Sequence, residues 1–478
     1  MLIFPLIPIL GALGVFLGLI GTYKQKTSDI LGCRVNRGFA ILSVLLIITA
    51  VFANNRIEAF LGLGNFLPFF IFFAAFSRLI QTPTQLRQLS WMIVISSIPV
   101  MFLGFGQQFL GWSGIVQLQP VFGWVLEPTG NPPGRMASVF MYANILACYL
   151  TIVFILALGL YIEGRSSATD FVTDLTDKRQ KNELPMPNFQ LLFLTFAVVG
   201  NAVCLIFTNS RNAWGLAVLA AVAFAVYAGW KKLLIMVFSA VGAVFLSAFG
   251  PQPLRQYLRT IIPAFFWARL TDEMFPNRPT ATLRTTQWQF AWSMTQQRPW
   301  TGWGLRNFTP LYEAQMHEWL GHPHSLMLML TAETGIPVTL FFFGLVGWIL
   351  ARGVLLLVNW RSHFPVDTQQ QEIEENSMSH ITNRVICQDV NSGDRIIFFS
   401  YLLAFAACTL FNTVDVTLFD LRVNTISWLL LAAICGIGNR ASGIGHRESG
   451  IGNRALGNRA LGIGHWELIP NPSYSHPL

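Results

Sequence analysis

Charged residues are scarce in this chain. Only 11% of its 478 residues are charged, whereas 53% are hydrophobic. Soluble domains typically carry roughly 25% charged residues, more than twice this share. The composition therefore excludes a soluble globular protein of this size, and we expect a polytopic membrane protein.

Cysteine patterns, a cleavable leader and a nucleotide motif are also lacking. The six cysteines are scattered without metal-ligand spacing, so neither a disulfide framework nor a zinc site is indicated. The apolar N-terminal stretch has no basic start and no small-residue cleavage site, so we expect a retained helix. The glycine pair in 302–307 follows no strand, which excludes a dinucleotide fingerprint there.

Long apolar runs, in contrast, are abundant. A helix needs about 20 apolar residues to cross the ~30 Å hydrocarbon core of a bilayer. Runs that approach or exceed this length occur at 1–21, 39–53, 59–77, 90–112, 138–162, 189–207, 212–229, 233–249, 325–358, 396–413 and 423–437. The sequence predicts an all-α membrane helix bundle of about 11–12 transmembrane helices.

The basic residues predict how the bundle is oriented. With the N-terminus outside, all six lysines fall on inner connections, as expected from the excess of basic residues in cytoplasmic loops. The outer connections then carry only arginines. Arginine binds phosphate oxygens bidentately and keeps its charge in a dry site. An anion site on the outer face and the general excess of arginine over lysine both remain open as explanations.

We divide the chain into four parts. Residues 1–249 contain the first eight helices, and 250–324 form one long outer loop with short amphipathic and catalytic helices. Residues 325–437 contain three further helices and a polar inner loop near 359–395. The tail 438–478 repeats glycine-containing units with a period near seven. Such a composition predicts a disordered, low-complexity extension.

The long outer loop contains two helical patterns. Residues 254–266 place apolar side chains on one stripe, which predicts a helix in the headgroup plane or one packed on the bundle. Further along, Arg284, Trp288 and Trp292 are spaced to share one helical face. A cation flanked by indoles suits a ligand with sugar and phosphate groups. The same pattern also occurs in interfacial aromatic belts, and both interpretations stay open.

Two histidines precede the next apolar run. His322 and His324 flank a proline, and no third ligand at a suitable spacing joins them, so we predict no metal. A histidine, with an ordinary pKa of about 6.5, suits removal of a proton from a hydroxyl group. Capping of the following helix is the structural alternative.

Polar residues of other connections are expected on the same outer face. Arg211 lies in a connection so short that it must sit near the interface, where arginines usually face a wet cavity or an anion. A role as an interfacial anchor beside Trp214 is the alternative. Arg135 begins the fifth helix, with Asn144 deeper on it, and simple snorkelling of Arg135 is the alternative. Asp415 and Asp420 reach the same face and are suited to pair with arginines or to orient a histidine, although such loop charges are more commonly solvated.

Four motifs in this order resemble the O-antigen ligase and polymerase superfamily of bacterial membrane glycosyltransferases. They are GR-x-x-S-x-F from Gly134, Ser210-Arg211, R-x-x-x-W with P-x-x-G-x-G from Arg284 to Gly304, and H-x-H leading into L-x-x-E-x-G from His322 to Gly335. Two positions depart from the family pattern: Ser325 replaces a usual asparagine, and Tyr142-Ala143-Asn144 replaces Asn-Pro-Asn.

The resemblance implies transfer of a polysaccharide or oligosaccharide from an undecaprenyl-pyrophosphate carrier to a sugar hydroxyl, without metal or cofactor. It implies a multi-pass protein of the bacterial inner membrane whose active face is periplasmic. The acceptor would be another glycan, as in a polymerase, or the lipid A core, as in a ligase. No nucleic acid takes part.

Roles for individual residues follow from the resemblance and the residue chemistry together. We expect His324 to be the base and Arg211 and Arg284 to clamp the pyrophosphate. Weaker contacts to the substrate are expected from four further residues: Arg135, His322, Trp288 and Trp292.

Transport is the alternative function. Some proteins of similar architecture are described as transporters of inorganic carbon, a small anion. Transport would require an ionisable relay or broken helices near the bilayer midplane, whereas the polar residues here gather on one face. A non-catalytic assembly scaffold is a third interpretation.

Overall fold

The computed structural model describes residues 1–177, 188–271, 273, 279–360 and 380–460. Within these ranges the chain forms helices and connections, and no strand occurs. The predicted all-α architecture is confirmed.

The first half of the chain contains ten α-helices and three short 3-10 turns. They are α1 (Pro8–Gly32), α2 (Arg34–Val51), α3 (Arg56–Gly62), η1 (Leu63–Asn65), α4 (Leu67–Leu79), α5 (Pro83–Leu110), η2 (Val116–Leu118), α6 (Gln119–Phe122), η3 (Ser138–Phe140), α7 (Ala143–Asp177), α8 (Asn188–Phe207), α9 (Arg211–Tyr227) and α10 (Lys231–Phe249).

The second half begins with the long loop and ends in two long helices. Its elements are α11 (Leu254–Ile261), α12 (Ala264–Leu270), η4 (Thr280–Thr282), α13 (Arg284–Gln297), α14 (Phe308–Met316), α15 (Leu326–Thr334), α16 (Ile336–Val358), α18 (His380–Phe411) and α19 (Leu421–Ala460). Helix α19 thus continues into the repeat segment, and 461–478 lie outside the described residues. The expected disorder of the tail stays a prediction.

Nine helices in the described part of the chain are long and apolar enough to cross a membrane. The predicted bundle is therefore confirmed, although two of the eleven runs are not among the nine. Helix α9 is apolar but has only 17 residues. Helix α1 has non-helical backbone angles at Lys26, which mark a kink.

The run at 325–358 is not one helix, and this prediction was wrong. Helix α15 ends at Gly335, whose φ of 80° lies in the left-handed region, and α16 begins at the next residue. A Cβ at Gly335 would lie 2.5 Å from the carbonyl oxygen of Trp300. The backbone of the preceding loop occupies the space that a side chain would need, so glycine ends the helix here.

The glycine pair of the long loop packs against the end of α15. The Trp303 and Gly304 amides donate to the carbonyls of Ala332 and Glu333, at 2.9 and 2.8 Å. Gly302 has a φ of 67°, and its Cβ would lie 2.4 Å from the Glu333 backbone. These glycines therefore allow two backbone segments to approach closely, and their contacts are structural.

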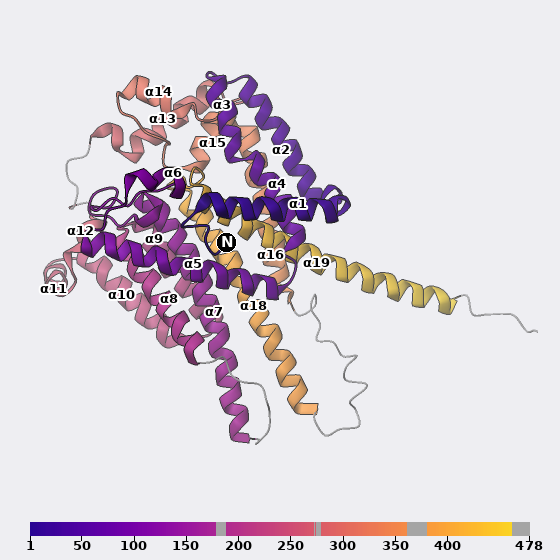
Figure 1. The fold of residues 1–478 in the computed structure, drawn as a ribbon. Helices are drawn as coiled ribbons and strands as arrows, with labels where there is room; N and C mark the ends of the chain where they lie inside the picture. The colour runs from indigo at the N-terminus through magenta and orange to yellow at the C-terminus, as the bar shows by residue number, and fades with distance from the viewer. Residues whose placement is uncertain (178–187, 272, 274–278, 361–379, 461–478) are drawn as a thin grey trace, which may run out of the picture.

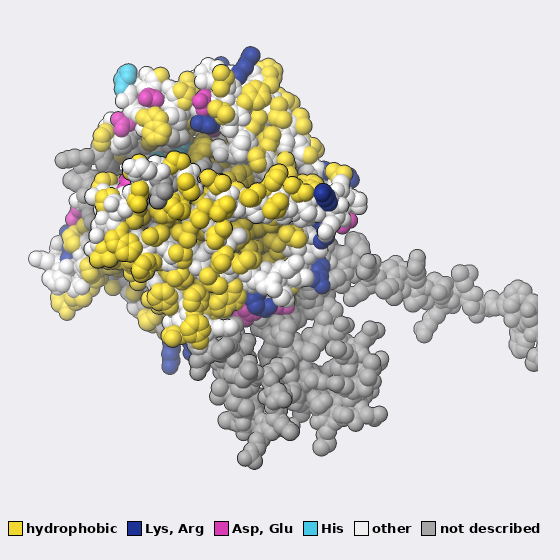
Figure 2. Space-filling view, in the orientation of Figure 1, with side chains coloured by type: hydrophobic (Ala, Val, Ile, Leu, Met, Phe, Trp, Pro, Cys, Tyr) yellow, Lys and Arg dark blue, Asp and Glu magenta, His cyan; other side chains and the backbone are white. Residues whose placement is uncertain are grey.

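Helices α7 and α18 pack together at the centre of the bundle (Figure 1). Small residues let the two backbones approach: a Cβ at Gly159 would lie 2.7 Å from that of Ser400. Lipid gives no hydrophobic drive between helices, so close packing of small residues holds them together. Figure 2 shows one face of the bundle, on which a broad apolar band lies over α1 and α5 and charged side chains lie at the borders of the band.

Connections assigned to the same side of the membrane contact one another. At one end, the Asn54 amide donates to the Trp303 carbonyl at 2.9 Å, and the Met136 amide donates to Phe207 at 3.0 Å. At the other end, Arg87 of α5 pairs with Asp394 of α18 at 2.9 Å and with Glu163 of α7. We refer to the first end, which carries the long loop, as the outer end.

The buried carboxyl group of Glu333 should make the stability of the protein depend on pH. It is 2% exposed, outside the candidate membrane spans, and accepts a hydrogen bond from the Phe308 amide at 3.2 Å. Burial raises its pKa to about 7. The folded state then binds the proton more tightly than the unfolded state, so stability falls as pH rises from about 4.5 through 7, by roughly 1 kcal/mol per pH unit.

We expect Glu333→Gln to remove this dependence, because the amide keeps the acceptor and cannot ionise. Thermal unfolding of the purified protein should show the stability of the variant rising relative to that of the wild type between pH 4.5 and 7. The exposed Glu313 of α14 offers the matched control, Glu313→Gln, which should follow the wild type. Parallel curves for wild type and Glu333→Gln would contradict the prediction.

Candidate active site

Three arginines converge on the turn between α8 and α9. The Arg135 Nε donates to the Thr208 carbonyl at 2.8 Å, and the Arg269 Nε donates to the next carbonyl, that of Asn209, at 3.3 Å. Arg211, the first residue of α9, donates to the Arg269 carbonyl at 3.2 Å. Arg135 and Arg269 are buried. One turn thus gathers three cations from distant parts of the chain, an arrangement that favours an anionic ligand.

A histidine and an aspartate form a hydrogen-bonded dyad at the outer end. The Nδ1 of His324 lies 3.0 Å from Oδ1 of Asp415, which is in the connection between α18 and α19. Asp415 is 3% exposed. Burial alone would raise its pKa, but the His324 hydrogen bond and charge, with the Val416 amide, outweigh burial and lower the pKa below its ordinary value. The dyad therefore contains an ionised carboxylate at neutral pH.

This contact assigns the proton on the His324 ring. A carboxylate only accepts hydrogen bonds, so the neutral ring carries its proton on Nδ1 and leaves Nε2 as an acceptor. The His324 backbone has a φ of 49°, in the left-handed region that non-glycine residues rarely adopt. Such strain persists only where surrounding contacts hold it, and it is frequent at functional sites.

A continuous hydrogen-bonded chain connects the dyad to the arginines. The Arg135 Nη2 donates to Asn144 Oδ1, and the Asn144 amide in turn donates to Asp415 Oδ2. Asn144 lies in the first turn of α7 and is buried. Because Asp415 holds His324 with its other oxygen, Arg135, Asn144, Asp415 and His324 form one relay. Arg135 therefore supports the dyad through Asn144, a connection that its sequence position did not indicate.

His322 packs beside the dyad, and its contacts also show which ring nitrogen is free of a proton. Its Nδ1 accepts the His324 backbone amide at 3.2 Å, and its Nε2 lies 4.0 Å from Asp415 Oδ1. Burial, followed by the charge of His324, lowers the pKa of His322 to about 4, and the charge of Arg284 acts in the same direction. The ring is therefore neutral at physiological pH.

The two histidines and Asp415 form a group with metal-ligand chemistry. One ligand atom from each lies within 4.8 Å of the others. The sequence spacing had suggested no third ligand, and the fold supplies Asp415 from a distant connection. Binding through His322 Nε2, however, would place the ring proton on Nδ1, where it would face the His324 N–H. The hydrogen bonds thus favour a proton-transfer site, and the absence of a metal stays a prediction.

The remaining predicted residues lie on α13. Arg284 is exposed at the start of this helix, near enough for its charge to act on His322. Trp288 is half-buried, whereas Trp292 is 48% exposed. The opposite face of α13, with Phe290, packs on Phe308 and Tyr312 of α14. Within the described residues, no hydrogen bond or ring contact joins either tryptophan to the dyad, so their roles stay predictions.

The acidic residues of the connection after α18 have separate partners. Asp415 orients His324, and Asp420 pairs with Arg422, whose Nη2 lies 2.6 Å from Asp420 Oδ2. Both pairings had been anticipated as alternatives from the sequence. Arg269 was missed as a site residue, because it follows the apolar stripe of 254–266, which suggested only a helix in the headgroup plane or one packed on the bundle.

The neutral state of His322 is testable by NMR. With histidine labelled in the ring nitrogens, we expect one signal to stay neutral at pH 5.5 and to vanish in His322→Gln. The sign follows from the lowered pKa: neutral His322 contributes stability above about pH 6.5, which is lost as pH falls toward 4. A His322 signal that protonates above pH 6 would contradict this assignment.

The central part of the chain matches a known protein family. No curated protein matches the chain. Residues 196–343 match the family model described as O-antigen ligase. The matched segment begins in α8 and ends in α16, so it includes Arg211, the whole long loop and both histidines. This match confirms the resemblance found in the sequence, and the central segment of the chain is similar to the O-antigen ligase family.

Proposed function

We propose that this protein transfers a polysaccharide or oligosaccharide from undecaprenyl pyrophosphate to a sugar hydroxyl at the periplasmic face of the inner membrane. The observation that carries the proposal is the His324–Asp415 dyad, 3.0 Å across, at the same end of the bundle as the arginine cluster. The family match supports a membrane glycosyltransferase of the O-antigen ligase type.

In the proposed reaction, His324 Nε2 accepts the proton of the acceptor hydroxyl. The hydroxyl oxygen forms a bond to the anomeric carbon of the donor sugar, and the bond from that carbon to the pyrophosphate oxygen breaks. The electron pair of the broken bond stays on the pyrophosphate. Ionised Asp415 stabilises the imidazolium that forms, in the manner of other aspartate–histidine pairs.

The arginines would act on the leaving group. Pyrophosphate gains negative charge as the glycosidic bond breaks, and guanidinium groups that are already in place stabilise that charge without reorganisation. Arg211 and Arg284 are the proposed catalytic contacts. Arg135 and Arg269 sit deeper, on carbonyls of the α8–α9 turn, and Arg135 is assigned a positioning role through Asn144.

The distribution of charge favours an enzyme over a transporter. In the described residues, the polar relay lies at the outer end and the Arg87, Glu163 and Asp394 cluster lies at the other end. Uptake of a small anion by vesicles without any lipid-linked glycan would favour transport instead.

The role of the base can be tested with His324→Ala. We expect transfer of glycan to fall by about 10²–10⁴-fold, the usual contribution of general base catalysis, while the protein remains in the membrane. His317→Asn is the matched control, because His317 is exposed and its φ of 55° suits asparagine. Long-chain glycan on a gel at wild-type level in His324→Ala would remove the proposed base.

Arg211→Ala should lower transfer by roughly 10²–10³-fold, as loss of one electrostatic donor typically does. Arg211→Lys should recover only part of the rate, because lysine lacks the bidentate geometry. Arg56→Ala, which alters an exposed arginine of α3, is the control and should transfer normally. Full activity of Arg211→Ala would contradict the pyrophosphate clamp.

Asp415→Asn tests the dyad independently. We expect a loss of about 10²–10⁴-fold, because the amide favours the wrong ring tautomer and does not stabilise the imidazolium. The acidic limb of the pH–rate profile should also move to lower pH, which a purely structural role would not cause. Asp420→Asn, which changes an acid of the same connection, should leave the shape of that profile unchanged.

A further inference from the structure

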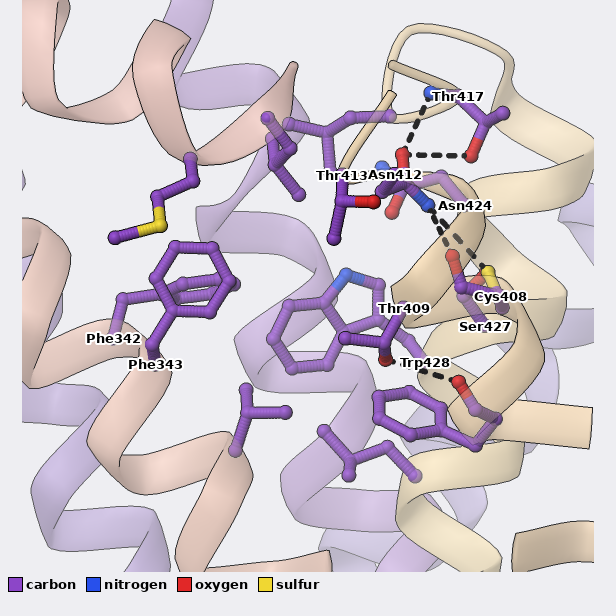
Figure 3. Close-up of a pocket in the computed structure, with 16 residues that line it drawn as sticks. Phe342, Phe343, Cys408, Thr409, Asn412, Thr413, Thr417, Asn424, Ser427 and Trp428 are labelled. Carbon is purple, nitrogen blue, oxygen red and sulfur yellow. Dashed lines mark hydrogen bonds between the residues drawn. The ribbon is translucent and has the colours of Figure 1, made fainter. Parts of the chain in front are cut away.

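A cavity of about 310 Å³ lies beside the dyad, between α15 and α16 on one side and α18 and α19 on the other. Figure 3 shows Phe342 and Phe343 of α16 across the cavity from Asn412, the residue after α18, and Ser427 of α19, with Trp428 between them. Leu326 lines it as well, two residues after His324. The cavity is partly open, and it adjoins the proposed base.

The surface of the cavity is apolar, although several of the residues that line it have polar side chains. The Asn412 amide donates to the Cys408 carbonyl at 2.8 Å, and its oxygen accepts the Thr417 amide at 2.9 Å. Thr409 donates to the Phe405 carbonyl at 2.9 Å. Their polar atoms are thus satisfied inside the protein, so the wall offers mainly carbon to a ligand. Hydrocarbon suits such a wall better than sugar does.

The cavity fits within one membrane leaflet. On α19 its lining extends from Asn424 to Leu431, and the helix begins at Leu421. Ten residues of helix from Leu421 span about 15 Å, half of the ~30 Å hydrocarbon core. The cavity therefore occupies the outer half of the bundle, below the level of His324.

The end of α18 separates the cavity from the arginine cluster. The Phe411 carbonyl accepts the side-chain amide of Asn212 of α9 at 3.2 Å. The next carbonyl, that of Asn412, accepts the Leu326 amide of α15 at 2.9 Å. The two consecutive carbonyls thus bind helices on different sides. A donor whose pyrophosphate contacts the arginine cluster at Arg211, on the α9 side, would leave the cavity, whose wall includes Leu326 of α15, to another molecule.

We propose that this cavity holds one hydrocarbon chain of the lipid that anchors the acceptor sugar. The inference rests on the proposed function, since it places a lipid-linked acceptor at His324. The volume is at the small end of ligand sites, which span about 300–1,000 Å³, and so fits one chain. Further chains of the same lipid would stay in the bilayer.

Occupancy is tested in the full-length protein in vesicles with a sugar on a single alkyl chain that carries a terminal diazirine. After irradiation, mass spectrometry should find the label on the α16 and α19 segments that line the cavity. Thr409→Trp, which fills the cavity, should lose the label, whereas Leu410→Trp should keep it, because Leu410 is exposed on the lipid side of α18. This readout requires no catalysis.

Transfer assays supply the second measurement. Thr409→Trp should raise the KM for a lipid-anchored acceptor about tenfold, as expected when some two methylene groups are excluded, and should not change use of the same sugar without its lipid. If a diazirine fatty acid without sugar labelled these segments equally, the cavity would hold only chains of the bulk membrane lipid. That result would overturn the proposal. A raised KM for the donor would assign the cavity to the donor and overturn it too. Wild-type protein that labels but transfers nothing would count against the proposed function alone.

Discussion

The buried carboxylate of Asp415 is the interaction on which the outer end of the bundle depends. A carboxylate that is 3% exposed must have hydrogen-bond donors, because an ionised group without them is very costly to bury. Its donors are the Val416 amide, the Asn144 side chain and the His324 ring. They belong to the α18–α19 connection, to α7 and to the segment before α15. The hydrogen bonds to this one carboxylate therefore fix the relative positions of three segments that are distant in the sequence.

The position of His324 also depends on backbone packing that surrounds it. A left-handed residue costs roughly 1–2 kcal/mol, so its neighbours must hold it. The Leu326 amide binds the end of α18, and the far end of α15 is held by the loop glycines, with Gly304 donating to the Glu333 carbonyl at 2.8 Å. The family motif of glycines and Glu333 therefore acts by holding the short helix that follows the histidines.

The sequence predicted the helical bundle and the shared face of the functional residues because both depend on local properties. Apolar length determines a membrane span, and the positions of lysine and arginine indicate sidedness. The break at Gly335 was missed because apolar composition continues across it, and only the loop backbone against Gly335 reveals it. Asp415 is 91 residues from His324 and Arg269 is 58 from Arg211. Such pairings depend on how the helices pack, which cannot be predicted from a single sequence.

The proposed arrangement explains why donor and acceptor can react without soluble carriers. Displacement at an anomeric carbon needs the incoming and leaving oxygens on opposite faces of that carbon. The arginine cluster and the cavity lie on different sides of the end of α18, and the dyad lies at that same end. Two lipids held there would arrive with their headgroups at one depth, because each is confined to the same leaflet. The membrane thus removes much of the translational and rotational freedom of the two lipids before they bind. The protein then needs mainly to align the reacting groups, and alignment of this kind contributes a large part of the rate enhancement.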